Sequence, residues 1–261
     1  MTASLDVLTA AVRGWLDEPR QGPLVLGLCG AQGSGKSTLT AGLAERIGVR
    51  TAILSLDDLY LRGAARAELA RTIHPLLRTR GVPLTHDVAR GIALIDAIRR
   101  GESVTLPRFD KAVDEPGAGE ALTGPIDLLI FEGWCVGARP QGDVSAPVNA
   151  LERDEDADAR WRSAVNAALA RDYAALFAHI DRLILLAAPG FDVVARWRGE
   201  QEAALRDQLA ATGKDVSGLM DEAAIARFVQ HYERLTRWIL AEMPMRADLV
   251  LRLDEERRLL P

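Results

Sequence analysis

The chain is poor in the residues that build disulfide scaffolds, zinc sites and membrane spans. Among its 261 residues it has two cysteines, Cys29 and Cys135. Two isolated cysteines form neither a zinc spacing nor a disulfide framework, so we expect reduced thiols. No apolar run is long enough to cross a bilayer, and acidic residues interrupt the N-terminal segment, unlike a signal peptide. These absences predict a cytoplasmic protein with no membrane partner.

An excess of basic charge is also missing. The chain carries 32 basic and 37 acidic residues, a net charge of −5, and this balance predicts no nucleic-acid partner. Lysine is scarce, with only Lys36, Lys111 and Lys214 beside 29 arginines. Because lysine is a compact point charge and arginine a planar fork, each lysine is a candidate for a site where arginine will not serve. We interpret Lys214 as a surface residue, and nothing in the composition indicates an oligomeric state.

Five short apolar runs alternate with helical patterns along the chain. The runs predict strands at 23–29, 51–56, 127–133, 182–188 and 247–253. Hydrophobic residues spaced three and four apart predict helices at 3–17, 36–47, 64–71, 87–100, 160–180, 191–211 and 221–242. Alternation of this kind predicts an α/β fold with a parallel sheet covered by helices on both faces.

Two stretches lack periodicity and are rich in Gly, Pro and acidic residues, namely 110–124 and 137–159. We expect them to be loops. Long loops in a compact domain are usually functional segments, and a solvated excursion is the alternative for the second.

The segment "GAQGSGKS" (30–37) matches the phosphate-binding pattern G-x-x-x-x-G-K-[ST]. Glycines let backbone N–H groups turn toward a phosphate, and the following helix points its positive end at the same anion. Lys36 would reach the outer phosphates and the Ser37 hydroxyl would hold Mg²⁺. The pattern predicts a site for a nucleoside triphosphate, with ATP favoured. Its residues are Gly30, Ala31, Gln32, Gly33, Ser34, Gly35, Lys36, Ser37 and Thr38.

Acidic residues follow the next two predicted strands. Asp57 and Asp58 end the second, and Glu132 ends the third. Ligands of parallel sheets gather at the carboxyl ends of strands, so one aspartate is expected to face the acceptor as general base. Neighbouring residues of an extended chain point opposite ways. The pattern alone leaves the base open between the two, although a helix cap is the favoured interpretation of Asp58. Glu132 would hold Mg²⁺ through water or polarise the acceptor.

The ordered segments "GAQGSGKSTL", "SLDDLYL", "RTRGVPLTHD", "LPRFDKAV" and "LIFEGWCVGARP" resemble the P-loop D-glycerate 3-kinases of the plant and fungal type. These belong with uridine kinase, phosphoribulokinase and bacterial pantothenate kinase. The resemblance runs from about residue 22 to 256. It implies a P-loop NTPase fold with a five-stranded parallel sheet and a helical lid. A single domain, 1–261, would carry acceptor-side insertions at about 60–124 and 137–160 and a lid at about 190–215.

The resemblance also implies roles for individual residues. Asp57 would be the general base, and an arginine of the lid, Arg196 or Arg198, would stabilise the transferring phosphoryl group. Helix capping is the alternative role for Asp87, and a turn is the alternative for Asp110. The residues expected to contact the acceptor are Asp57, Arg80, His86, Asp87, Arg108, Asp110 and Lys111.

The implied activity is ATP-dependent phosphorylation of a small hydroxy acid, with D-glycerate converted to 3-phosphoglycerate. The segment "GVPLTHD" and the acidic stretch after "DKA" depart from the family pattern on the acceptor side. Two alternatives therefore stand beside the first. The acceptor would be another small alcohol, such as a nucleoside, pantothenate or a sugar, or the protein would be a catalytically silent ATP-binding regulator.

Overall fold

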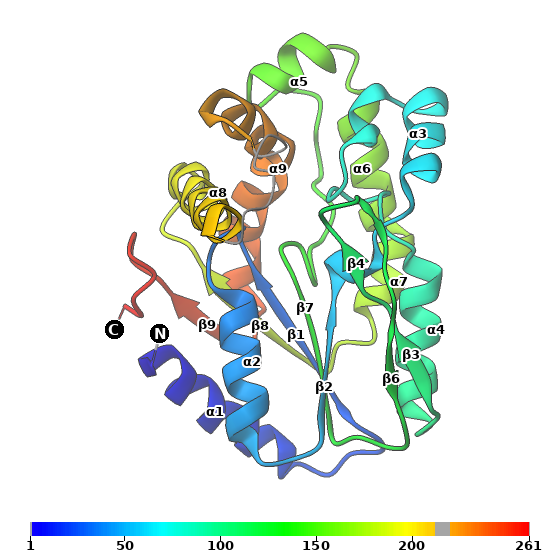
Figure 1. Ribbon diagram of the computed structural model, residues 1–261, viewed down its shortest axis with the longest axis vertical. Coiled ribbons are helices and arrows are strands. Elements are labelled where there is room, and N and C mark those ends of the chain that lie inside the picture. Colours follow the sequence, from blue (N-terminus) through cyan, green and yellow to red (C-terminus); the bar gives the residue numbers. More distant parts are fainter. Residues whose placement is uncertain (1, 212–219, 261) are drawn as a thin grey trace.

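The computed structural model describes residues 2–211 and 220–260. Its centre is a five-stranded parallel sheet with the strand order β2-β7-β1-β8-β9 (Figure 1). This confirms the predicted α/β fold with its five parallel strands. The strands are β1 (Leu24–Gly30), β2 (Thr51–Ser55), β7 (Leu128–Gly133), β8 (Arg182–Ala187) and β9 (Leu249–Arg252).

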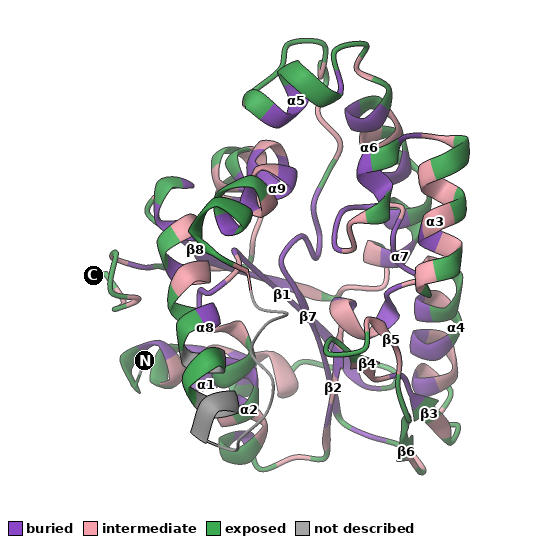
Figure 2. Ribbon diagram, turned by 45° about the horizontal axis from the view of Figure 1, so that its top comes forward, coloured by how far each residue is buried: buried purple, intermediate pink, exposed green. Residues whose placement is uncertain are grey.

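The inner strands consist almost wholly of apolar residues because both faces of the sheet are covered. Every residue of β1 and β7 is buried, whereas buried and half-buried residues alternate in the edge strand β2. Figure 2 shows this burial along the centre of the sheet. Such continuous burial is typical of parallel strands packed on both sides.

Helices cover each face of the sheet. One layer packs α1 (Thr2–Leu16), α2 (Lys36–Ile47) and α8 (Asp192–Ala211) against Leu26, Leu28 and Ile130. The opposite layer packs on Leu54, Leu129 and Phe131. Its helices are α4 (Val88–Arg99), α6 (Arg160–Ala170) and α7 (Asp172–Phe177), with α3 (Gly63–Thr72) and α5 (Ala150–Glu155) farther out (Figure 1).

The helix α9 (Glu222–Glu242) contributes to both layers. Its residues Ile225 and Val229 belong to the first core, and Tyr232, Leu235 and Ile239 belong to the second. Short 3₁₀ helices complete the chain at Leu56–Leu59, Pro75–Arg78 and Met243–Met245. Among the described residues, no helix combines the length and apolar character needed to span a bilayer.

The structure differs from the sequence prediction at three places. The helix predicted at 160–180 is broken at Arg171, which leaves helical geometry and starts α7 in a new direction. The loop predicted at 110–124 instead contains strands that form two small antiparallel pairs. The pairs are β3 (Val104–Leu106) with β6 (Glu120–Leu122), and β4 (Phe109–Asp110) with β5 (Glu115–Pro116).

The third difference is α5, which lies inside the predicted loop 137–159 and is capped by Asn149. The predicted lid, 190–215, coincides with α8 as far as residue 211. Its last residues, 212–215, and with them Lys214, lie outside the described residues.

Candidate active site

The glycine loop connects the end of β1 to the start of α2, the context that the phosphate-binding pattern requires. Gly33 (φ +74°) and Gly35 (φ +90°) adopt left-handed conformations that a side chain disfavours. The Lys36 Nζ donates to the Ala31 carbonyl oxygen at 3.0 Å, so the ammonium group lies over the loop. The loop therefore places a cation and a helix N-terminus at one point.

Glycine is also required here by packing. A Cβ on Gly33 would lie 2.6 Å from the Trp197 Cβ, and a Cβ on Gly30 would lie 2.9 Å from the Ser34 Oγ. The helix α8 consequently rests directly on the loop.

A cavity of about 350 Å³ lies in front of the loop. It is bordered by the carboxyl ends of β2 and β7, by α8 and α9, and by the acceptor-side segments. The predicted site residues that line it are Gln32, Gly33, Lys36, Ser37, Asp57, Arg80, Lys111, Glu132 and Arg198.

Asp57 is held between a cation and a phenol in this cavity. Its Oδ2 accepts from the Lys111 Nζ at 2.6 Å, and its Oδ1 accepts from the Tyr60 hydroxyl at 2.6 Å. Burial acts to raise the pKa of Asp57, but Lys111 and the hydrogen bond from Tyr60 outweigh it and hold the pKa below its usual value. Burial raises the pKa of Tyr60 well above its usual value, so the phenol stays a donor. Asp57 is an ionised, oriented carboxylate.

Asp58 points the other way and has a different function. It accepts from the Phe109 backbone N–H at 3.0 Å and from the Arg108 Nη1 at 3.1 Å, and so holds β4 against the 3₁₀ helix. The prediction that Asp58 caps a helix is wrong, because the cap of this helix is Ser55. Both oxygens of Asp58 have partners, which favours Asp57 as the base.

Glu132 lies at the end of β7 with only 6% of its surface exposed. Burial raises the pKa of Glu132, and the opposing charge of Lys36 reduces this shift. The carboxylate of Glu132 and the hydroxyl of Ser37 line the same cavity. A carboxylate and a hydroxyl are the oxygen donors that Mg²⁺ takes beside phosphates and water. These two residues therefore fit a magnesium ion bound with a nucleotide.

The structure separates the two arginines of α8. Arg198 lines the cavity, pairs with Glu202 at 2.6 Å, and its buried Nε has no hydrogen-bond partner. Arg196 turns outward and pairs with Glu255 at 3.2 Å. Because residues two apart on a helix diverge by about 200°, only Arg198 faces the cavity. The placement of Arg196 contradicts its predicted role.

Four predicted acceptor contacts lie outside the cavity lining. Arg108 pairs with Asp58 and, at 2.6 Å, with Glu120. Asp110 is exposed and accepts from the Ala112 N–H at 2.9 Å, so it forms a turn. Asp87 caps α4 by accepting from the Arg90 N–H at 3.0 Å.

The fourth, His86, lies one layer behind the cavity. Its ring packs 4.9 Å from the ring of Tyr60, which lines the cavity, and its Nδ1 lies 2.5 Å from the Tyr173 hydroxyl. Burial lowers the pKa of His86 to about 4, so the ring is neutral. These positions correct the prediction that Arg108, Asp110, Asp87 and His86 contact the acceptor.

Sequence reasoning missed the aromatic residues that build the walls of the cavity. Tyr232 donates to the Arg80 carbonyl at 2.8 Å, and Trp134 donates to the Gly81 carbonyl at 2.7 Å. Gly81 (φ +117°) leaves no room for a Cβ beside Tyr232. The signal for Trp134 was its position directly after "FEG", and Tyr60 stands three residues after Asp57. Tyr232 has no local signal, because it lies 152 residues from Arg80.

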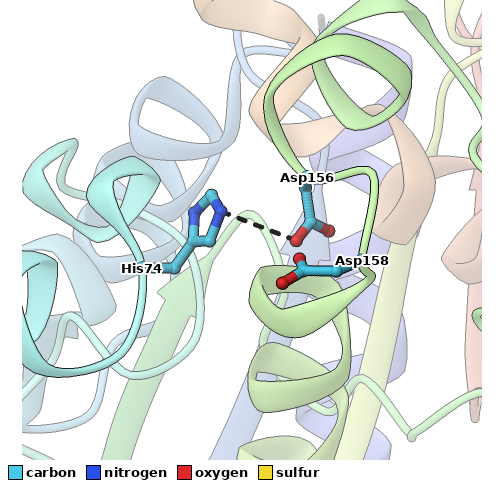
Figure 3. A group of neighbouring side chains, drawn as sticks. All are labelled: His74, Asp156 and Asp158. Carbon is cyan, nitrogen blue, oxygen red and sulfur yellow. Dashed lines mark ion pairs between the residues drawn. The ribbon is translucent and has the colours of Figure 1, made fainter.

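A second group, His74, Asp156 and Asp158, resembles a metal site in its composition (Figure 3). The His74 Nδ1 accepts from the Leu76 N–H, so its Nε2 carries a hydrogen and faces the Asp156 Oδ1 at 3.7 Å. Asp156 also accepts from the Trp161 N–H at 2.7 Å and from the Arg162 Nη1 at 2.8 Å. With these lone pairs engaged, the group acts as a polar joint between the acceptor-side segment and α6.

A glycine loop that faces two acids across one cavity, on a parallel sheet, defines a P-loop kinase. No model of a protein family matches the chain. A Schizosaccharomyces pombe protein named "Uncharacterized kinase mug58" is 34% identical over 254 residues, with 88% of this chain and 87% of that protein covered. This chain belongs to the P-loop kinase family of that protein.

Two further similarities agree with this assignment. The Saccharomyces cerevisiae protein named "Probable ATP-dependent kinase TDA10" is 29% identical over 156 residues, covering 52% of this chain and 54% of that protein. The structure of D-glycerate 3-kinase from Cryptococcus neoformans superposes with a TM-score of 0.72 at 24% identity, covering all of this chain (100%) and 96% of that one. The kinase class and the use of ATP are thereby supported, and the last similarity shows the shared fold.

The burial of Glu132 generates a prediction about stability. Glu132→Gln should raise the thermal unfolding midpoint at pH 8 and leave it nearly unchanged at pH 4. The folded-state pKa of Glu132 lies above its unfolded value, so its contribution to stability is present below the unfolded pKa and is lost as the pH rises through the folded one. Glutamine mimics the neutral acid at every pH. The exposed Glu45→Gln is the control, and an equal shift at both pH values would contradict the expectation.

Proposed function

We propose that the protein transfers the γ-phosphoryl group of ATP to a hydroxyl group of a small hydroxy acid, with D-glycerate as the favoured acceptor. The observation that carries this proposal is the ionised Asp57 facing the same cavity as the glycine loop. A carboxylate there accepts the proton of an incoming alcohol late in the transfer. A regulator without turnover has no need of an oriented base.

Each group around the cavity has a distinct task in the proposed reaction. The loop binds the triphosphate through its backbone, and Lys36 contacts the outer phosphates. The ion held by Ser37 and Glu132 supplies charge neutralisation between the β- and γ-phosphates. Arg198 stabilises the charge that spreads over the transferring group. In this proposal α8 acts as the lid, and the segments 60–124 and 137–160 form the acceptor side of a single domain.

Cations on the acceptor side favour an anionic acceptor. Arg80 and Lys111 both line the cavity near Asp57, and the Arg80 guanidinium lies 5.8 Å from the Phe109 ring centre. An arginine binds a carboxylate through two parallel hydrogen bonds. Arg80 now pairs with Asp114, a carboxylate of the chain itself, which shows that its guanidinium accepts this partner chemistry. The name of the Cryptococcus neoformans structure adds support for D-glycerate.

An acceptor screen tests the substrate directly. ATP and Mg²⁺ would be combined with D-glycerate, L-glycerate, uridine, pantothenate and a hexose, and ester product and ADP would be quantified. We expect the highest kcat/KM with D-glycerate and equal amounts of ester and ADP. Preferred turnover of uridine or a sugar would replace the proposed acceptor, and ATP binding without ester from any alcohol would favour the silent regulator.

The assignment of the base predicts different effects at the two adjacent aspartates. Asp57→Asn should lower kcat by roughly 100-fold or more, the usual worth of a general base, while ADP affinity stays near that of the wild type. Asp58→Asn is the matched control, because Asp58 holds Phe109 and Arg108. Steady-state kinetics and calorimetric titration with ADP measure the two quantities. A larger loss of kcat in Asp58→Asn would reverse the assignment.

The same logic applies to the two acceptor-side arginines. Arg80→Ala should raise KM for a carboxylate acceptor by roughly tenfold, since hydrogen bonds to charged groups contribute about 1.5–3 kcal/mol, and should leave KM for ATP nearly unchanged. Arg108→Ala should affect KM for the acceptor much less, because Arg108 pairs with Asp58 and Glu120. Equal effects of Arg80→Ala on both substrates would count against its role in the acceptor pocket.

A further inference from the structure

We propose that Arg257, beyond the last strand, is a positioning residue that holds the glycine loop in its nucleotide-binding conformation. The Arg257 Nε donates to the Gly33 carbonyl oxygen at 2.5 Å, across 224 residues of sequence. Arg257 is not among the residues that line the cavity. It therefore acts on the loop from behind and not on the nucleotide.

The guanidinium of Arg257 is held from three sides. Besides the bond to Gly33, it lies over the Trp197 ring, 4.9 Å from the ring centre, and pairs with Glu200 at 2.6 Å. A planar guanidinium can stack and donate at once, whereas an ammonium group cannot. The contact joins three parts of the chain, namely the glycine loop, the helix α8 and the C-terminal turn.

Trp197 links these parts a second time. It is fully buried, it donates from Nε1 to the Glu255 carbonyl at 2.8 Å, and its Cβ lies where a Cβ of Gly33 would be. We refer to Gly33, Trp197 and Arg257 as the loop clasp. Arg198 follows Trp197 directly, so the clasp also sets the point from which Arg198 reaches the cavity.

The backbone of Arg257 gives independent support. The turn is closed by the Leu253–Leu259 bridge and by Asp254, whose carboxylate accepts from the N–H groups of Glu256 and Arg258. Within it, Arg257 has φ +63°, a left-handed conformation that glycine adopts without strain and arginine does not. Strained conformations of this kind persist where surrounding contacts over-determine them, and they cluster at functional sites. The turn alone thus favours glycine, and the side chain is what the position gains from arginine.

The clasp has a direct physical consequence for nucleotide binding. Gly33 has no side chain to restrict its peptide, and an inward carbonyl oxygen would repel a phosphate. The cationic Arg257 keeps this oxygen on the far side of the loop. If the loop holds its competent conformation for only a tenth of the time without the clasp, the apparent dissociation constant rises about tenfold.

The test compares Arg257→Ala and Arg257→Gly with Arg258→Ala, a change at the exposed neighbouring arginine. The probe is ADP with Mg²⁺, titrated calorimetrically into the full chain, with thermal unfolding of the free protein as a parallel measurement. Both Arg257 variants should bind ADP about tenfold more weakly. Arg257→Gly should do so although it removes the backbone strain, and Arg258→Ala should bind like the wild type. Arg257→Lys should restore little, because it lacks the Nε donor and the planar group.

Three results would overturn the proposal. One is wild-type affinity in Arg257→Gly, which would mean that only the backbone of the turn matters. Another is an equal loss in Arg258→Ala. The third is a lowered unfolding midpoint in the Arg257 variants with unchanged ADP affinity, the signature of a purely structural role.

The proposal rests on the nucleotide-binding part of the proposed function and not on the acceptor. Wild-type protein that binds ADP but phosphorylates no hydroxy acid would refute the acceptor and leave the clasp intact. Wild-type protein that does not bind ADP would refute both.

Discussion

The parallel register of β2, β7 and β1 is the constraint on which the site depends. Glu132 of β7 stands opposite Leu28 of β1 and Ser55 of β2, so the three strands end at the same edge. The glycine loop leaves β1 two residues after Leu28, and Asp57 follows Ser55 by two. A slip of one residue would turn Glu132 toward the opposite face of the sheet. Burial of both faces of β7 therefore fixes the chemistry as well as the fold.

Charge compensation in this desolvated cavity is the second organising effect. Lys36, Arg80, Lys111 and Arg198 border it together with Asp57, Asp58 and Glu132. Lys111 keeps Asp57 ionised, whereas burial of Glu132 prevails over the charge of Lys36. Two acids at one strand edge thus have pKa values displaced in opposite directions by their surroundings. The acid with the lowered pKa is oriented for the acceptor, and the one with the raised pKa gains most from a cation bound in front of it.

The scarcity of lysine proved informative about where the cavity lies. Lys36 and Lys111 both border it, on the nucleotide side and the acceptor side respectively. Strands and most helices also followed from periodicity, because burial on one or both faces is written locally into the sequence. The direction of a side chain in an irregular segment is not local. Arg108 turns from the cavity because Asp58, 50 residues earlier, takes its guanidinium, and Arg80 stays in it because Tyr232 anchors its backbone.

The same reasoning explains why the lid arginine was ambiguous in the sequence and is not in the structure. Helical geometry requires Arg196 and Arg198 to diverge, but only the packing of Trp197 determines which of them faces inward. Trp197 is fixed by Gly33 on one side and by the C-terminal turn on the other. The glycine at 33 thus serves two demands at once, a left-handed backbone and close contact with α8. A residue read from the motif as a phosphate-binding element is equally the seat of the helix that carries Arg198. Nucleotide binding and the placement of that arginine are therefore coupled through a single contact.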